Sequence, residues 1–159
     1  MEQFEGKAFG WRLVLYPLSA VIVPIGWRLA GRPAPYPYAM DILLVSPFLV
    51  DVLGNTFDLY DSITWWDDLN HLVNWTLLSL AVGQLALRLR LPRLEVFVVV
   101  VGVGAVAAIL WELGEYVAFI RDSDELDTAY TDTLGDMMLG LAGATVAGIL
   151  SATILGRDD

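Results

Sequence analysis

Three pairs of ionisable residues lie at the ends of apolar stretches in this chain of 159 residues: Asp67 and His71, Glu112 and Glu115, and Asp132 and Asp136. Carboxylates and imidazoles can act as general acids and bases, and they can hold divalent cations. The chain has no cysteine, which excludes thiolate ligands and disulfides. A metal site would therefore use carboxylates, the single histidine, amides or water.

The spacing within the first two pairs would place both side chains on one face of a helix. Residues three or four apart are neighbours on a helix surface, and Asp67 precedes His71 by four positions. Metal sites in helical bundles use this spacing. We take all six residues as candidate metal ligands and five as candidate catalytic groups: Asp67, His71, Glu112, Glu115 and Asp136. Because no nucleophile motif stands out, hydrolysis by a bound water is favoured over covalent catalysis.

Periodic stripes predict that these acids face other helices and not lipid. The last stretch has a small or acidic residue at every fourth position: Asp132, Asp136, Gly140, Ala144 and Gly148. Small residues at this spacing let membrane helices approach closely. Similar faces occur in the other stretches: Gly104, Ala108, Glu112 and Glu115; Asp67, His71, Asn74 and Leu78; and Asp51, Asn55 and Asp58 if that helix continues so far. Several carboxylates meeting there would have to share protons, pair with His71 or bind a cation.

The elements that would position these residues are membrane helices. The chain is 57% hydrophobic with a mean hydropathy of +0.60. Five apolar segments cover about residues 9–30, 38–55, 67–87, 94–120 and 131–155. About 20 residues at ~1.5 Å each cross a ~30 Å hydrocarbon core. The sequence predicts an all-α, multi-pass bundle of about five transmembrane helices in the cell membrane, with residues 1–159 as one domain.

Basic residues predict the orientation, because they are enriched in cytoplasmic loops. Six arginines would share one side of a five-span bundle: Arg28, Arg32, Arg88, Arg90, Arg93 and Arg157. The other side has Lys7, Arg12 and Arg121 among many acids. We therefore expect the N-terminus outside and the C-terminus in the cytoplasm, with the acidic cluster at the outer end. A net charge of −10 argues against a nucleic-acid partner and leaves membrane lipid, with a homo-oligomer or membrane-complex partner open.

Simpler structural roles compete with a functional one. Asp67 and Asp132 could each cap a helix, as Asp often does. A single histidine is commonly a hydrogen-bonded structural residue. Glu112 and Glu115 are harder to explain in this way, because the dipole at a helix C-terminus disfavours anions. The acids of the following loop are typical of a solvated surface: Asp122, Asp124, Glu125 and Asp127.

The combined motifs resemble those of the YjdF-like family of small membrane proteins and, more distantly, the VanZ-like family. The resemblance covers residues 55–144 and rests on three segments: Trp66 to His71 (WDDLNH), Trp111 to Glu115 (WELGE) and Asp132 to Asp136 (DTLGD), the last followed by Gly143 and Ala144. It implies that the family's acids and histidine correspond to the six candidates above. Two positions depart from the pattern, because Asp68 stands where lysine is common and Gly140 where VanZ-like proteins have asparagine.

Three functions remain open on the sequence. The first is a membrane-embedded enzyme or binding protein in which a divalent cation acts on a lipid-linked or headgroup substrate. The second is a proton or cation pathway, or a transporter component, although five spans without an inverted repeat are few for alternating access. The third is an accessory subunit whose polar cluster only stabilises the bundle.

Overall fold

The computed structural model describes residues 9–118 and 120–155, which form helices joined by short connections and contain no strand. Four long helices lie within two residues of the predicted segments: α1 (Phe9–Leu29), α2 (Tyr38–Thr56), α4 (Trp66–Arg88) and α5 (Arg93–Ala118). The fifth, α6 (Ala129–Leu150), ends five residues before its predicted end, and a π-helical turn continues to Leu155. Short elements join or extend them: α3 (Leu59–Ser62), the 3-10 turns η2 (Ile120–Asp122) and η3 (Asp124–Asp127), and the π-helical η4 (Ser151–Leu155). Lys7 and Arg157, used above for orientation, lie outside the described residues.

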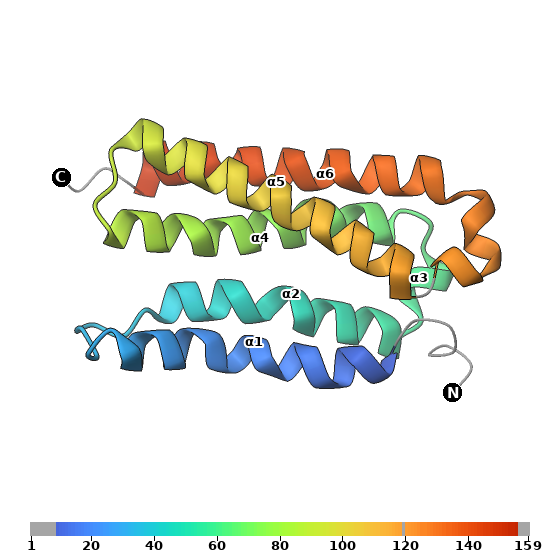
Figure 1. The fold of residues 1–159 in the computed structure, drawn as a ribbon, viewed down its shortest axis with the longest axis horizontal. Coiled ribbons are helices and arrows are strands. Elements are labelled where there is room, and N and C mark those ends of the chain that lie inside the picture. Colours follow the sequence, from blue (N-terminus) through green and yellow to red (C-terminus); the bar gives the residue numbers. More distant parts are fainter. Residues whose placement is uncertain (1–8, 119, 156–159) are drawn as a thin grey trace.

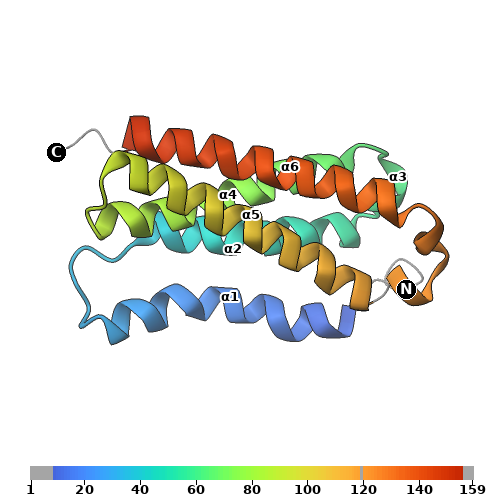
Figure 2. The same cartoon turned by 45° about the horizontal axis from the view of Figure 1, so that its top comes forward.

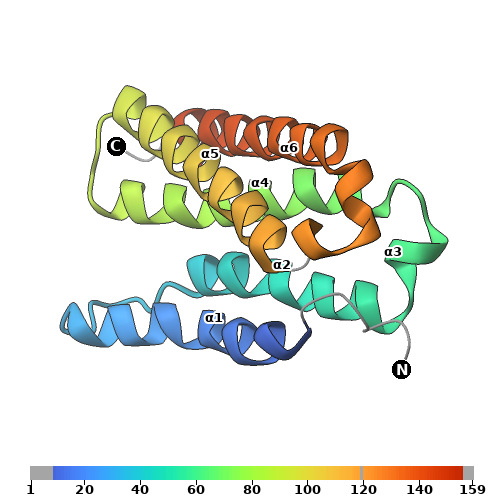
Figure 3. The ribbon, with the colours of Figure 1, turned by 45° about the vertical axis from the view of Figure 1, so that its right-hand side comes forward.

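The helices form two layers, with α1 and α2 in one and α4, α5 and α6 in the other (Figures 1 and 3). α4 is the central helix, because it packs against α2, α5 and α6, whereas α1 packs against α2. The turned view in Figure 2 shows α1 at the edge of the bundle. The start of α1, the α2–α4 connection and the α5–α6 connection lie at one end, as the prediction of five antiparallel spans requires (Figure 1).

The outward-facing surface is apolar along most of the bundle. Leu13, Ile42, Val98 and Met138 are among many large apolar side chains that are exposed on α1, α2, α5 and α6. These four helices are long and apolar enough to cross a membrane by length and composition. α4 does not meet that criterion, because its first turns contain several polar residues, although it has 23 residues. Its central position explains part of this composition, since Asn70, His71 and Ser79 are buried among the other helices.

Small residues allow the central helices to approach closely. Gly140, Ala144 and Gly148 are buried on α6 as their spacing predicted, together with Gly143 and Ala147 on the same side. A Cβ atom added to Gly143 would lie 2.5 Å from the Leu72 carbonyl oxygen on α4. The stripe is therefore a packing face, and it holds α6 against α4 and α5.

The helix starts exclude two of the simpler roles considered for the acids. Trp65 is the N-cap residue of α4 and Thr128 that of α6, so Asp67 and Asp132 lie inside the first turns and cap neither helix. The possible extension of α2 to Asp58 is wrong. That helix ends at Thr56, and Asp58 is exposed with a left-handed backbone conformation (φ 58°).

Candidate functional site

A cavity of about 520 Å³ lies between the two layers. Its lining comes from α1, α2, α3, α4, α5 and α6 and includes the residue that starts η2. Seven carboxylates line it, together with one guanidinium and one imidazole: Asp51, Asp61, Asp67, Glu112, Glu115, Asp132, Asp136, Arg12 and His71. Acids from different helices therefore converge, and they surround the cavity.

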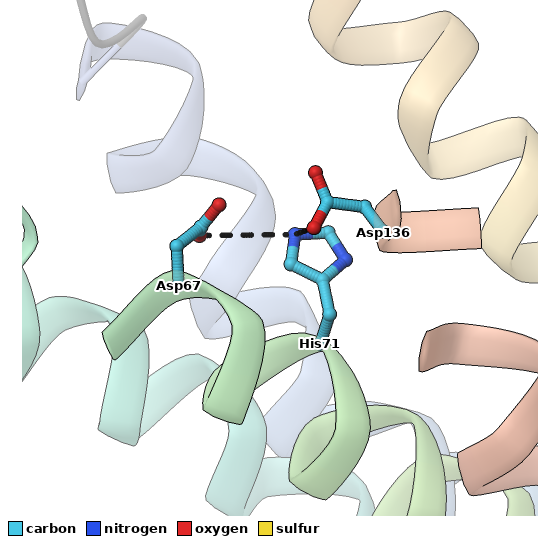
Figure 4. Close-up of side chains that lie close together, drawn as sticks. All are labelled: Asp67, His71 and Asp136. Atoms are coloured by element: carbon cyan, nitrogen blue, oxygen red, sulfur yellow. Dashed lines mark ion pairs between the residues drawn. The ribbon is translucent and has the colours of Figure 1, made fainter. Parts of the chain in front are cut away.

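His71 lies at the centre of the acidic cluster. Its Nε2 atom is 3.8 Å from Asp67 Oδ1 and 3.7 Å from Asp136 Oδ1 (Figure 4). Its Nδ1 atom is 3.6 Å from Glu112 Oε1. The side chains of His71, Glu112 and Asp136 are only 9%, 4% and 6% exposed, whereas that of Asp67 is 46% exposed. One imidazole therefore faces three carboxylates from three helices. Asp67 is the most exposed of these four residues.

Two sets of ligand atoms could hold a metal ion, and both use His71. One comprises Asp67, His71 and Asp136, and the other His71, Glu112 and Glu115; in each set the atoms lie within 4.8 Å of one another. The second set has a competitor, because Arg12 Nη2 lies 3.7 Å from Glu115 Oε1. A positive charge beside one ligand opposes cation binding there. The first set is therefore the better candidate.

Two atoms of this cluster are buried without a hydrogen-bond partner: His71 Nδ1 and Glu112 Oε1. They face each other at 3.6 Å, a distance slightly too long for a hydrogen bond. Buried polar groups in folded proteins are normally satisfied, so each of these two atoms needs a partner. A metal ligand histidine typically donates its second ring N–H to a carboxylate, which fixes the ring orientation. Glu112 is placed to accept that proton.

A second cluster, a network of hydrogen bonds, is centred on the Asp51 carboxylate. The sequence placed Asp51 on a polar helix face but did not predict this network. Arg12 Nη1 donates to its two carboxylate oxygens at 2.9 and 2.8 Å. The Tyr16 and Tyr60 hydroxyls also donate to this carboxylate, each at 2.8 Å. Asn55 donates to the Asp51 carbonyl oxygen at 2.9 Å. Asp51 is thus fully compensated, and this network connects α1, α2 and α3 at the cavity.

The sequence argument missed three members of this network: Arg12, Tyr16 and Tyr60. Arg12 entered only as a topology charge, although a lone arginine near the start of an apolar helix is itself a signal of a buried partner. Tyr60 lies in α3, outside the long helices. Burial and the nearby Asp51 carboxylate raise the pKa of Tyr60 above its ordinary value, so its hydroxyl remains a donor near neutral pH.

The structure separates the six predicted residues into three groups. His71, Glu112 and Asp136 are buried at the centre, and Asp67 lies at the mouth beside them. Glu115 lines the same cavity but faces Arg12. Asp132 also lines the cavity, yet it is exposed and belongs to neither set of ligand atoms that the described residues form. The loop acids Asp122, Asp124 and Asp127 are exposed, as expected of a solvated surface.

The fold and the cavity define an all-helical membrane protein with a buried acidic and histidine cluster that could hold a metal ion. The chain belongs to the family described as Predicted membrane protein (DUF2238), whose family model matches residues 4–157. This agrees with the YjdF-like resemblance, whereas no link to VanZ-like proteins is shown. Neither a curated protein nor a solved structure matches the chain.

Proposed function

We propose that this protein binds a divalent cation through Asp67, His71 and Asp136, at the outer surface of a cell membrane, where the ion contacts a polar group of a membrane lipid. His71 would ligate through Nε2 while Glu112 accepts the proton on Nδ1. The two aspartates supply oxygen ligands, as hard cations prefer, and the imidazole extends the choice to zinc, manganese or iron. Asp67 is the half-exposed ligand through which the ion would enter and meet a substrate.

The observation that best supports the proposal is the position of His71 Nε2 between the carboxylates of Asp67 and Asp136. Its distances to Asp67 and Asp136, 3.8 and 3.7 Å, are too long for hydrogen bonds. They suit atoms gathered around one ion, because ligands ~2.0–2.6 Å from a common centre lie about 3–4 Å apart. An ion would also compensate carboxylates that are otherwise costly to bury.

Metal analysis of the purified protein tests the proposal directly. We expect about one divalent ion per chain, removed by a chelator and restored with a rise in thermal stability by calcium, magnesium, manganese or zinc. Asp136→Asn and His71→Ala should each abolish stoichiometric binding. Glu112→Gln should weaken it by roughly 10–100-fold, as loss of an outer partner does. The matched control is Asp124→Asn, an exposed carboxylate in η3 that should change nothing.

Two results would contradict the proposal. One is a protein that contains no stoichiometric metal and gains no stability from any of the four ions. The other is a metal content that Asp136→Asn leaves unchanged. In either case the cluster would instead be a proton-sharing pathway or a structural network, the two alternatives that the sequence leaves open.

A further inference from the structure

The cavity is much larger than a metal ion requires, and its two ends differ in chemistry. The acids line one end. Away from them the lining is apolar, with Leu44, Pro47, Phe48, Leu78, Val82 and Ala107 from α2, α4 and α5. Along α4, His71 and Val82 are eleven residues apart, which corresponds to ~16 Å of helix. This is about half of a ~30 Å hydrocarbon core, the depth of one lipid leaflet.

The charge of the acidic end selects against an anionic ligand. Seven carboxylates line the cavity against Arg12 and His71, and Arg12 is already held by Asp51. One divalent ion would leave this end negative. Trp111, Tyr16 and Tyr60 also line it, and aromatic rings attract organic cations. A positively charged head therefore fits this end better than a phosphate monoester or a carboxylate.

The cavity also extends between α2 and α5, whose outer surfaces would contact lipid in a membrane. α2 and α5 both contribute to its lining, yet they do not form one of the helix-packing interfaces among the described helices, which join α2 to α1, α3 and α4. Arg12 on α1 contacts Glu115 on α5 near this part of the cavity, at 3.7 Å. An apolar chain could therefore enter between α2 and α5 without passing through water.

We propose that the cavity binds a membrane amphiphile with an ammonium head and one hydrocarbon chain, entering from the bilayer between α2 and α5. The head would lie beside Asp67 and Asp132, away from Arg12 and Glu115, and the chain along the apolar lining to Val82. This inference names a substrate class for the proposed function, and it rests on that proposal only for the position of the polar end. A cation bound by Asp67, His71 and Asp136 would lie next to the head, on the more buried side of Asp67.

The test uses the full-length protein in a neutral maltoside detergent, with dodecyltrimethylammonium as the probe and dodecyl sulfate as the anion of equal chain length. Native mass spectrometry counts the molecules retained per protein. We expect one dodecyltrimethylammonium and no dodecyl sulfate. Ala107→Phe should lower ammonium retention by roughly tenfold or more, because it fills the apolar end and keeps methylenes out of it. Val106→Phe is the matched control, since the adjacent Val106 is 57% exposed on the outside of α5.

Equal retention of the two probes would overturn the argument from charge, and equal retention by Ala107→Phe and Val106→Phe would overturn the argument from the cavity. Leu44→Phe fills the same end from α2 and replaces Ala107→Phe if that variant does not fold. Metal content, measured on the same samples, keeps the two proposals distinguishable. A protein that contains the metal but does not retain the ammonium probe refutes only this inference. A protein that retains the probe but contains no metal refutes only the proposed cation site.

Discussion

Gly143→Ala tests how closely α6 packs against α4. The added Cβ would lie 2.5 Å from the Leu72 carbonyl oxygen, 2.9 Å from the Thr76 amide nitrogen and 3.0 Å from Thr76 Oγ1. Two of these three atoms belong to the backbone, so a side-chain rotation cannot remove the overlap. The helices themselves must separate by several tenths of an ångström at this level.

The expected cost follows from two opposing effects. Overpacking a close contact typically costs about 1–3 kcal/mol, whereas Gly→Ala within a helix contributes about 0.5–1 kcal/mol of stability. Gly135→Ala on the same helix isolates the second effect, because an added Cβ there meets nothing within 4 Å. Gly135→Ala should therefore be neutral or stabilising. Gly143→Ala should be less stable than Gly135→Ala by about 1–3 kcal/mol.

The unfolding free energy can be measured by SDS titration in mixed micelles for both variants and the wild type. Equal stability of Gly143→Ala and Gly135→Ala would show that α6 does not approach α4 here, and the alignment of Asp136 with His71 would lose its basis. Metal binding provides a second measurement. Gly143 lies two turns from Asp136, so separation of the helices should lengthen the 3.7 Å His71–Asp136 distance and weaken the site.

Three further predictions concern the bundle as a whole. The chain has no cysteine, so single cysteines can be introduced for labelling. A membrane-impermeant maleimide should label Ser62→Cys in intact cells and Arg90→Cys only after permeabilisation. Labelling of both positions from one side would refute the five-span topology. Gly140→Leu should lower the thermal stability in detergent, since even a Cβ there would lie 2.8 Å from the Ala108 Cβ, and an unchanged melting temperature would place this face against lipid. Asp51→Asn should destabilise by about 3 kcal/mol, the low end for a broken buried pair, because Arg12 loses the nearer of its two carboxylate partners. Adding Arg12→Met should recover most of that loss, and no recovery would mean that Asp51 acts through its tyrosine partners instead.

Local sequence patterns predicted the helices and much of the site. Segment lengths and the breaker around residues 31–37 gave the long helices to within a few residues, because a membrane core fixes how many apolar residues a helix needs. The four-residue spacing of Asp136, Gly140 and Ala144 placed them on one buried face, since helix periodicity is a local property. The same reasoning correctly assigned His71 and Glu112 to the interior.

The same periodicity was insufficient where a residue's environment depends on another helix. Asp132 shares the stripe of Asp136 yet is exposed, because it lies one turn nearer the start of α6. Glu115 faces Arg12 because α1 and α5 approach at the cavity, and no local pattern reports that approach. The stripe therefore determined which side of a helix turns inward, and the packing of neighbouring helices determined how deeply each residue is buried.

The sequence by itself determined the class of protein, the helices and the set of acids that face inward, because hydropathy and periodicity act within one segment. Only the tertiary structure decided how those acids are divided. Arg12 and Asp51 are 39 residues apart, and their contact depends on how α1 packs on α2. The selection of His71, Asp67 and Asp136 as the better ligand set, and the apolar extension of the cavity between α2 and α5, likewise follow from packing between distant segments.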